Sequence, residues 1–185
     1  MASSLLKEYR PVIKFIGTFL GVYLLFTLAY KFYLDFSVGS QYYPDYFSNL
    51  VGRQTVALLD VLGYDAQLFK STQPILNLKV NHKFLAFISE GCNGISIIIL
   101  FASFIISFAS KFKTTVLYIL VGSVLIYVVN LIRIVIIAIA LYHYPWREEI
   151  LHNVIFPGLI YSMVFVLWMF WVYRFNKINT ANEAE

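Results

Sequence analysis

The chain contains a single cysteine, Cys92, in the polar stretch Glu90-Gly91-Cys92-Asn93-Gly94 that immediately precedes the apolar run 95–108. The two glycines of this stretch leave the backbone open on both sides of the thiol. If the apolar run forms a helix, its N-terminus carries a partial positive charge that favours the thiolate, the nucleophilic form of cysteine. The stretch therefore indicates nucleophilic chemistry at Cys92, and the alternative is a small packing residue.

A cation lies within a later apolar segment, in the sequence Asn130-Leu131-Ile132-Arg133. A guanidinium costs about 2.5 kcal/mol or more at mid-membrane, so a charge inside such a segment is a candidate functional residue. Arg133 lies 19 residues after Thr114, which is roughly 28 Å along a helix and near the outer end of this segment. Asn130, one turn earlier, could hold the guanidinium by hydrogen bonding. The alternative is an arginine that extends to the lipid headgroups.

Further side chains could complete a site for acyl transfer. His152 stands just before the last apolar segment, at the predicted depth of Cys92 and Arg133, and could act as a general base. His143, ten residues beyond Arg133, is the rival base, and either histidine could instead be an interfacial anchor. Glu90 could orient His152 or Arg133, or cap the following helix. A thiol, a histidine base and a donor to the developing oxyanion are the minimum set for acyl transfer through a thioester.

The composition indicates that these residues belong to an integral membrane protein. The chain of 185 residues, enough for one domain, is 60% hydrophobic and 13% charged, whereas soluble domains carry about 25% charged residues. The net charge of +4 is modest and gives no reason to expect nucleic acid as a partner. One cysteine excludes an internal disulfide and a multi-cysteine metal site, and neither a metal nor another cofactor is expected.

Four apolar segments are predicted to cross the bilayer, which takes about 20 residues; the second is short for a crossing and the third is long enough to tilt or protrude. They are residues 12–30, 95–110, 114–142 and 154–173. The first could alternatively be a cleaved signal peptide, because small residues follow it at 37–39, but its length favours a retained helix.

Basic residues flank these segments and predict their orientation. With four crossings, all three basic groups lie on one side, which is the cytoplasm if positive charge marks the inside. Both termini are then cytoplasmic, and residues 37–88 and the short loop 142–153 are extracytoplasmic. The basic residues are Lys7, Arg10 and Lys14 at the start, Lys111 and Lys113 between the second and third segments, and Arg174 and Lys177 after the fourth.

The extracytoplasmic residues 37–88 begin with a polar, aromatic stretch and continue with an amphipathic pattern. Residues 45–62 carry apolar side chains at spacings of three and four, as in a helix with one apolar face. Asp45 can cap the start of this helix and Gly63 its end. Because it is too polar to span, the helix is expected on the membrane surface or against the bundle.

Two strand-like runs follow and lead to the cysteine. Residues 76–81 alternate between apolar and polar side chains, and residues 84–88 form a second run after a plausible turn. We therefore predict an all-α integral membrane protein, a single domain over residues 1–185, with about four transmembrane helices. An extracytoplasmic amphipathic helix and a small β-hairpin complete this predicted fold.

These residues resemble the exosortase/archaeosortase family of membrane transpeptidases. The resemblance lies in the order of Gly91-Cys92-Asn93-Gly94, then Asn130-Leu131-Ile132-Arg133, then His152 ahead of the last helix. It covers about residues 45–173, and in size and composition the chain looks most like the short exosortase F branch found in Bacteroidetes. Larger exosortases usually have Ala-Cys-Ser-Gly at the cysteine and carry more membrane helices.

The resemblance implies a cysteine transpeptidase or peptidase of the bacterial cytoplasmic membrane, with its active site on the extracytoplasmic side. Its substrates would be secreted proteins with a C-terminal sorting tail, which consists of a short motif, a hydrophobic helix and a basic end. Cys92 would be the nucleophile, Arg133 the oxyanion stabiliser and His152 the general base and acid. Supporting residues would be Asn130, Glu90 and Asn93. Membrane lipid surrounds such a protein, and a membrane protein partner is a further possibility.

Two other classes of protein remain alternatives at the level of sequence. A non-catalytic membrane protein, such as an assembly partner or small transporter, would use Cys92 for packing. A transporter would typically show internal repeats and broken helices, and the sequence shows neither. A membrane acyltransferase would use a similar nucleophile on a lipid.

Overall fold

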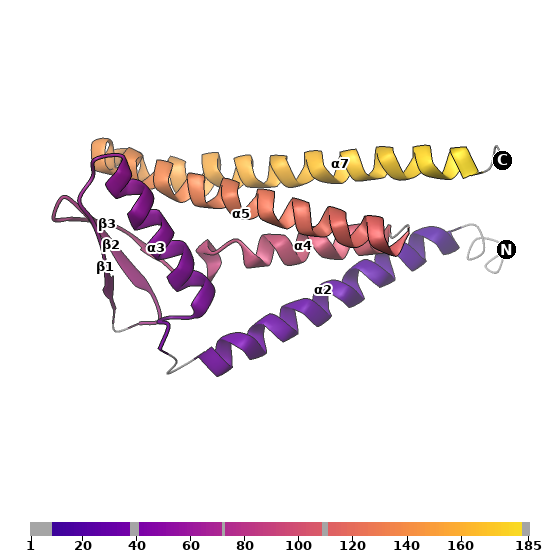
Figure 1. Ribbon diagram of the computed structural model, residues 1–185, viewed down its shortest axis with the longest axis horizontal. Helices are drawn as coiled ribbons and strands as arrows, with labels where there is room; N and C mark the ends of the chain where they lie inside the picture. Colours follow the sequence, from indigo (N-terminus) through magenta and orange to yellow (C-terminus); the bar gives the residue numbers. More distant parts are fainter. Residues whose placement is uncertain (1–8, 38–40, 72, 109–110, 183–185) are drawn as a thin grey trace.

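The protein is an elongated helical bundle that is closed at one end by a small sheet and a short helix (Figure 1). The structure, a computed structural model, describes residues 9–37, 41–71, 73–108 and 111–182. The bundle consists of α2 (Arg10–Ser37), α4 (Ile95–Ser107), α5 (Phe112–His143) and α7 (Phe156–Asn182). Both termini lie at the end of the bundle opposite the sheet (Figure 1).

Among the described residues, three stretches of helix are long and apolar enough to cross a membrane: Arg10–Ser37, Phe112–His143 and Pro145–Arg174. They correspond to the first, third and fourth predicted segments. The second segment, predicted at 95–110, is the shorter apolar helix α4 of 13 residues, which is about 20 Å long. It packs inside the bundle against α2, α5 and α7.

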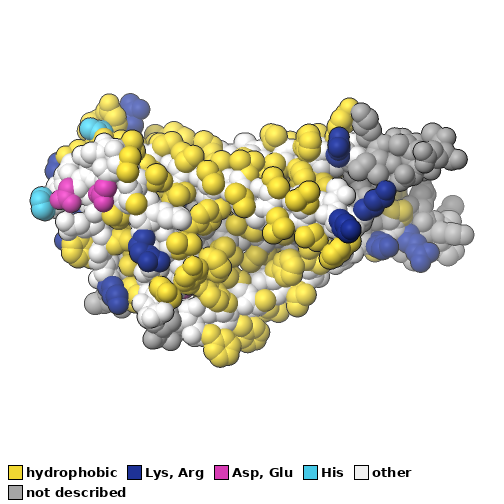
Figure 2. Space-filling view, viewed as in Figure 1, with side chains coloured by type: hydrophobic (Ala, Val, Ile, Leu, Met, Phe, Trp, Pro, Cys, Tyr) yellow, Lys and Arg dark blue, Asp and Glu magenta, His cyan; other side chains and the backbone are white. Residues whose placement is uncertain are grey.

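Charge and hydropathy follow the long axis of the molecule. Hydrophobic side chains cover the middle of the face seen in Figure 2, Lys and Arg side chains lie toward both ends, and the Asp, Glu and His side chains seen on this face lie at the sheet end. The start of α2, the start of α5 and the end of α7 meet at the end that carries the termini (Figure 1). The three basic groups of the sequence flank these three places, so they share one end of the bundle, as the topology prediction requires.

The segment predicted as a loop at 142–153 is instead a series of helical turns. These turns reverse the chain after α5 and pass directly into α7, so there is no extended connection between the two helices. They are the 3-10 turn Pro145–Arg147, the short helix α6 (Glu148–Ile150) and the π-helical turn Leu151–Ile155.

The predicted amphipathic helix is confirmed as α3 (Tyr46–Val61). The Asp45 carboxylate caps it by accepting hydrogen bonds from the backbone N–H groups of Phe47 (2.9 Å) and Ser48 (3.1 Å). Gly63 adopts φ = +86° just beyond the C-terminus, a conformation that favours glycine. The buried residues are spaced as on one helix face: Ser48, Val51, Gly52, Thr55 and Leu59.

The predicted hairpin is present but belongs to a sheet of three antiparallel strands in the order β1-β2-β3. Strands β2 (Leu76–Val80) and β3 (Lys83–Ile88) are joined at Asn81 and His82, which have φ = +48° and +67°. Two left-handed residues in succession are typical of a tight hairpin turn. The first strand, β1 (Ala66–Lys70), was not predicted.

The sheet packs its inner face on the bundle and so fixes the end of β3. Leu78 and Val80 are buried in a cluster with Leu59 of α3 and with Val135 and Ala138 of α5. A second cluster, within the bundle, holds α4, α5 and α7 together and contains Phe101, Ile105, Ile126, Val164 and Trp171. The residues between β3 and α4 therefore run between two packed cores.

Candidate active site

Cys92 lies in the short connection between β3 and α4. The chain leaves β3 at Ile88 and makes the 3-10 turn Glu90–Cys92, in which the Cys92 N–H donates to the Ser89 carbonyl oxygen (2.9 Å). Gly94 then adopts φ = +81°, and a Cβ atom there would lie 3.3 Å from Cγ of Asn130. Both the backbone conformation and the close approach explain a glycine at this position.

Asn130 hydrogen-bonds the backbone of Cys92 rather than the arginine. Its side-chain amide donates to the Cys92 carbonyl oxygen (2.8 Å), and Asn130 is buried in α5. The sequence-based expectation that Asn130 would hydrogen-bond Arg133 is therefore wrong: the helix turns the amide toward the cysteine loop. Asn130 ties the loop to α5.

Asn93, the residue after the cysteine, ties the loop to three other elements. Its side chain is fully buried, and the amide nitrogen donates to the hydroxyls of Tyr30 in α2 (2.7 Å) and Ser48 in α3 (3.2 Å). The amide oxygen accepts from the Ile95 N–H at the start of α4 (2.9 Å). Two buried amides, those of Asn130 and Asn93, thus anchor the backbone at the Cys92 carbonyl and at the next residue.

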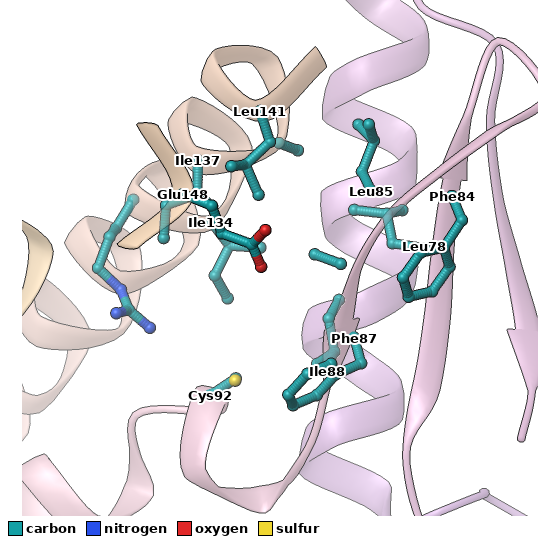
Figure 3. A pocket seen from close by; sticks show the side chains of 13 residues that line it. Leu78, Phe84, Leu85, Phe87, Ile88, Cys92, Ile134, Ile137, Leu141 and Glu148 are labelled. Atoms are coloured by element: carbon teal, nitrogen blue, oxygen red, sulfur yellow. The ribbon is translucent and has the colours of Figure 1, made fainter. Parts of the chain in front are cut away.

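The half-buried thiol faces a cavity of about 240 Å³ between the sheet and α5. Figure 3 shows the Cys92 sulfur and the Glu148 carboxylate pointing into this cavity, while most of its wall is apolar. The lining residues come from β2 and β3 (Leu78, Phe84, Leu85, Ala86, Phe87, Ile88), from the cysteine loop (Cys92), from α5 (Arg133, Ile134, Ile137, Ala138, Leu141) and from α6 (Glu148).

Arg133 reaches the same cavity from α5. Its Nε atom is buried and has no hydrogen-bond partner, a costly state for a charged donor. Arg133 also lines a second cavity, of about 180 Å³, on the side of α4 and α7. Arg133, whose Nε–H has no hydrogen-bond acceptor, therefore borders the same cavity as Cys92, the only cysteine of the chain.

A known family fits this arrangement. The family model described as transmembrane exosortase (Exosortase_EpsH) matches residues 13–172. The chain belongs to the transmembrane exosortase family. The match is to the family as a whole rather than to the F branch, and no curated protein and no solved structure matches the chain.

The backbone of His152 lies beside this exosortase cavity, but its side chain is outside the described part of the structure. His152 belongs to the π-helical turn Leu151–Ile155, four residues after Glu148, which lines the cavity. Its neighbour Leu151 packs against Ile137 and Leu141 of the cavity wall. The turn thus brings the backbone of His152 to the end of the bundle where Cys92 and Arg133 lie.

The other titratable candidates lie outside the cavity. His143, the rival base, is exposed at the end of α5, and its Nε2 atom is hydrogen-bonded to the Tyr64 hydroxyl (3.0 Å). Glu90 is exposed in the turn before Cys92. Neither residue is among those that line the cavity.

Glu148 is the cavity residue that sequence reasoning missed. It lies in the segment predicted as a loop, where nothing in the spacing of residues relates it to Cys92. The helical turns after α5 fold this segment back over the cavity, and the carboxylate enters it (Figure 3). No ion pair between Glu148 and Arg133, both of which are described, is found within 4.0 Å.

Proposed function

We propose that this exosortase is a cysteine transpeptidase or peptidase that cleaves the C-terminal sorting tail of secreted proteins. The observation that supports this proposal best is that Cys92 and Arg133, which are distant in sequence, border one cavity. The unpartnered Nε donor of Arg133 supports a role in binding negative charge. Such donors are worth about 10²–10³ in kcat when they are aimed at a developing oxyanion.

In the proposed reaction, the Cys92 thiolate attacks the carbonyl carbon of the scissile peptide bond. Arg133 stabilises the oxyanion of the tetrahedral intermediate. His152, which takes the thiol proton first, gives it to the leaving amine as the C–N bond breaks. A thioester between Cys92 and the substrate remains, and an amine or a water molecule attacks it, which restores the thiol.

The proposed topology places the reaction outside the cytoplasmic membrane. The basic end of the bundle faces the cytoplasm by the positive-inside rule, so the sheet and the cavity face outward. The hydrophobic helix of the sorting tail would lie in the membrane beside α4, α5 and α7. Its N-terminal flank would then reach Cys92 at the level of the sheet.

Processing of a reporter tests the proposal directly. The reporter carries the C-terminal tail of a secreted protein encoded beside this exosortase and is expressed with it in bacterial cells. We expect Cys92→Ala to abolish cleavage and Arg133→Met to lower it by about 10²–10³, while both variants stay in the membrane. Arg53→Met, a change at an exposed arginine on α3, is the matched control and should cleave normally. Cleavage by the Cys92→Ala variant would refute the role of the thiol.

A thiol reagent separates the enzyme from a non-catalytic assembly protein. The chain has one cysteine, so any label on the purified protein reports on Cys92. A membrane-impermeant maleimide added to intact cells should label the wild type and not Cys92→Ala. An unreactive thiol would favour the assembly protein. A lipid acyl group found on Cys92 by mass spectrometry would favour an acyltransferase.

A further inference from the structure

Strand β3 has one free edge. The sheet order is β1-β2-β3, so within the described part of the chain β3 pairs with β2 and with no other strand. A free edge presents backbone N–H and C=O groups that can pair with another extended chain. Here this edge is close to the nucleophile, because β3 ends at Ile88 and Cys92 follows after one short turn.

Hydrogen bonds at the two ends of the β1–β2 ladder show which peptide groups of β2 face β1. The Asn81 N–H donates to the Asp65 carbonyl (2.7 Å), and the Ser71 N–H donates to the Ile75 carbonyl (3.3 Å). Since the bonding direction alternates along a strand, the even-numbered residues of β2 face β3. Their partners are Lys83, Ala86 and Ile88.

The alternation leaves Phe87 with its peptide groups on the free edge. Its two neighbours, Ala86 and Ile88, are the residues that pair with β2 through hydrogen bonds. Among the described residues, no backbone hydrogen bond outside the sheet involves Phe87. Its N–H and C=O groups are therefore available to a further strand.

The cavity reaches this edge. Five consecutive residues of β3, 84–88, line it, although successive side chains of a strand point to opposite faces. Phe87, for example, is 53% exposed on the outer face, while Ile88 is 2% exposed on the inner face. A space that touches both sets of side chains must pass around the edge of the strand, where the backbone lies. Figure 3 shows Phe87 and Ile88 beside this space, close to Cys92.

We propose that the substrate residues on the N-terminal side of the scissile bond bind as a fourth strand along the free edge of β3. This inference rests on the proposed function and specifies how the peptide is recognised. Main-chain hydrogen bonds would supply affinity, and the apolar wall of Ile134, Ile137 and Leu141 would select small or apolar side chains at alternate positions.

The direction of the added strand follows from the topology. The hydrophobic helix of the sorting tail is in the membrane and lies C-terminal to the scissile bond, so the N-terminal side occupies the cavity by the sheet. The carbonyl that Cys92 attacks is at the C-terminal end of this segment. Because β3 also runs toward Cys92, the substrate segment lies parallel to β3.

A peptide that alkylates the thiol provides the test. The probe is acetyl-tetraalanyl vinyl sulfone, in which the thiolate adds to the vinyl carbon β to the sulfone, next to the last alanyl Cα, and the vinyl carbon bonded to sulfur takes the proton. Four analogues each carry one N-methylated amide, and labelling of Cys92 is followed by mass spectrometry on the purified full chain. In a strand, alternate N–H groups face the partner. We expect N-methylation at two alternate positions to slow labelling about ten-fold, and at the other two by less than about three-fold.

A pair of variants tests the same edge from the protein side. Phe87→Pro removes one N–H from the free edge without removing a donor to β2, whereas Phe87→Ala retains that N–H. Relative to Phe87→Ala, Phe87→Pro should be labelled about ten-fold more slowly by the peptide probe. Methyl vinyl sulfone, which has no peptide, should label both variants equally and so reports on the integrity of the site.

The outcomes distinguish this inference from the proposed function. If the four N-methylated analogues react at equal rates, strand addition is wrong, while the role of Cys92 stands. If neither vinyl sulfone labels wild-type Cys92, the nucleophile role fails and strand addition fails with it.

Discussion

Replacing Arg133 by methionine is expected to stabilise the protein and inactivate it at the same time. The substitution keeps an unbranched side chain and removes the guanidinium. Arg133 has a buried Nε atom without a hydrogen-bond partner, and an unsatisfied buried donor costs about 1–3 kcal/mol. That cost disappears in Arg133→Met, so the free energy of unfolding should rise by a similar amount.

The expected change is large enough to measure. For chains of 150–250 residues, 1 kcal/mol shifts Tm by about 2–4 °C, so a gain of about 1–3 kcal/mol predicts a rise of about 2–12 °C. Tryptophan fluorescence of the protein in detergent can follow unfolding, since the chain has three tryptophans. Cleavage of the reporter should fall by about 10²–10³, the usual effect of losing an oxyanion donor.

In Arg133→Met, the Tm should rise while the rate of reporter cleavage falls. Arg53→Met should change neither, because Arg53 is exposed on α3, away from the cavity. A lower Tm for Arg133→Met would refute the reasoning, since it would mean that the guanidinium stabilises the fold. An unchanged cleavage rate would refute the role in catalysis.

Three further substitutions test how the cysteine loop and the bundle are held. Gly94→Ala should lower stability by about 1–2 kcal/mol, seen as a lower Tm, because φ is +81° and the new Cβ lies 3.3 Å from Asn130; an unchanged Tm would contradict this. Gly122→Ala brings a Cβ within 2.4 Å of Phe101 and should cost about 1–3 kcal/mol. In the double variant Gly122→Ala/Phe101→Leu, the smaller side chain should recover much of that loss of stability. If the losses of the two single variants simply add in the double variant, the clash is excluded. Asn93→Ala removes the amide that joins α2, α3 and α4; we expect faster hydrogen exchange at the start of α4, and unchanged protection would show that the amide is dispensable.

The sequence predicted those parts of the fold that carry local signals. Helix α3 has an apolar face and the capping residue Asp45, and the β2–β3 hairpin has strict alternation and a two-residue turn. Strand β1 has neither signal: only Ala66 of its five residues is buried, so no alternation marks it. It forms because β2 offers an edge with which it can pair. This pairing is part of the tertiary structure and leaves no local pattern in the sequence of β1.

The sequence predicted that Cys92 and Arg133 lie near each other, but not how their side chains are oriented. Counting residues along the apolar segments predicted one membrane depth for both, and in the structure both border one cavity. The rotation of α5 about its axis, which turns the amide of Asn130 to the Cys92 carbonyl, depends on packing against α4 and the sheet. The place of Glu148 depends on the helical turns after α5, and a predicted loop gives no hint of them.

One side chain, that of Arg133, is common to the wall of the cavity at the sheet and to the wall of the cavity beside α7. Truncation to alanine would therefore do two things at once: it would delete the charge and enlarge both cavities. A loss of cleavage in such a mutant would have two explanations, the second being the changed shape of the cavity in front of Cys92. A replacement of similar length keeps both cavity walls in place, and only then does the lost cleavage measure the charge itself.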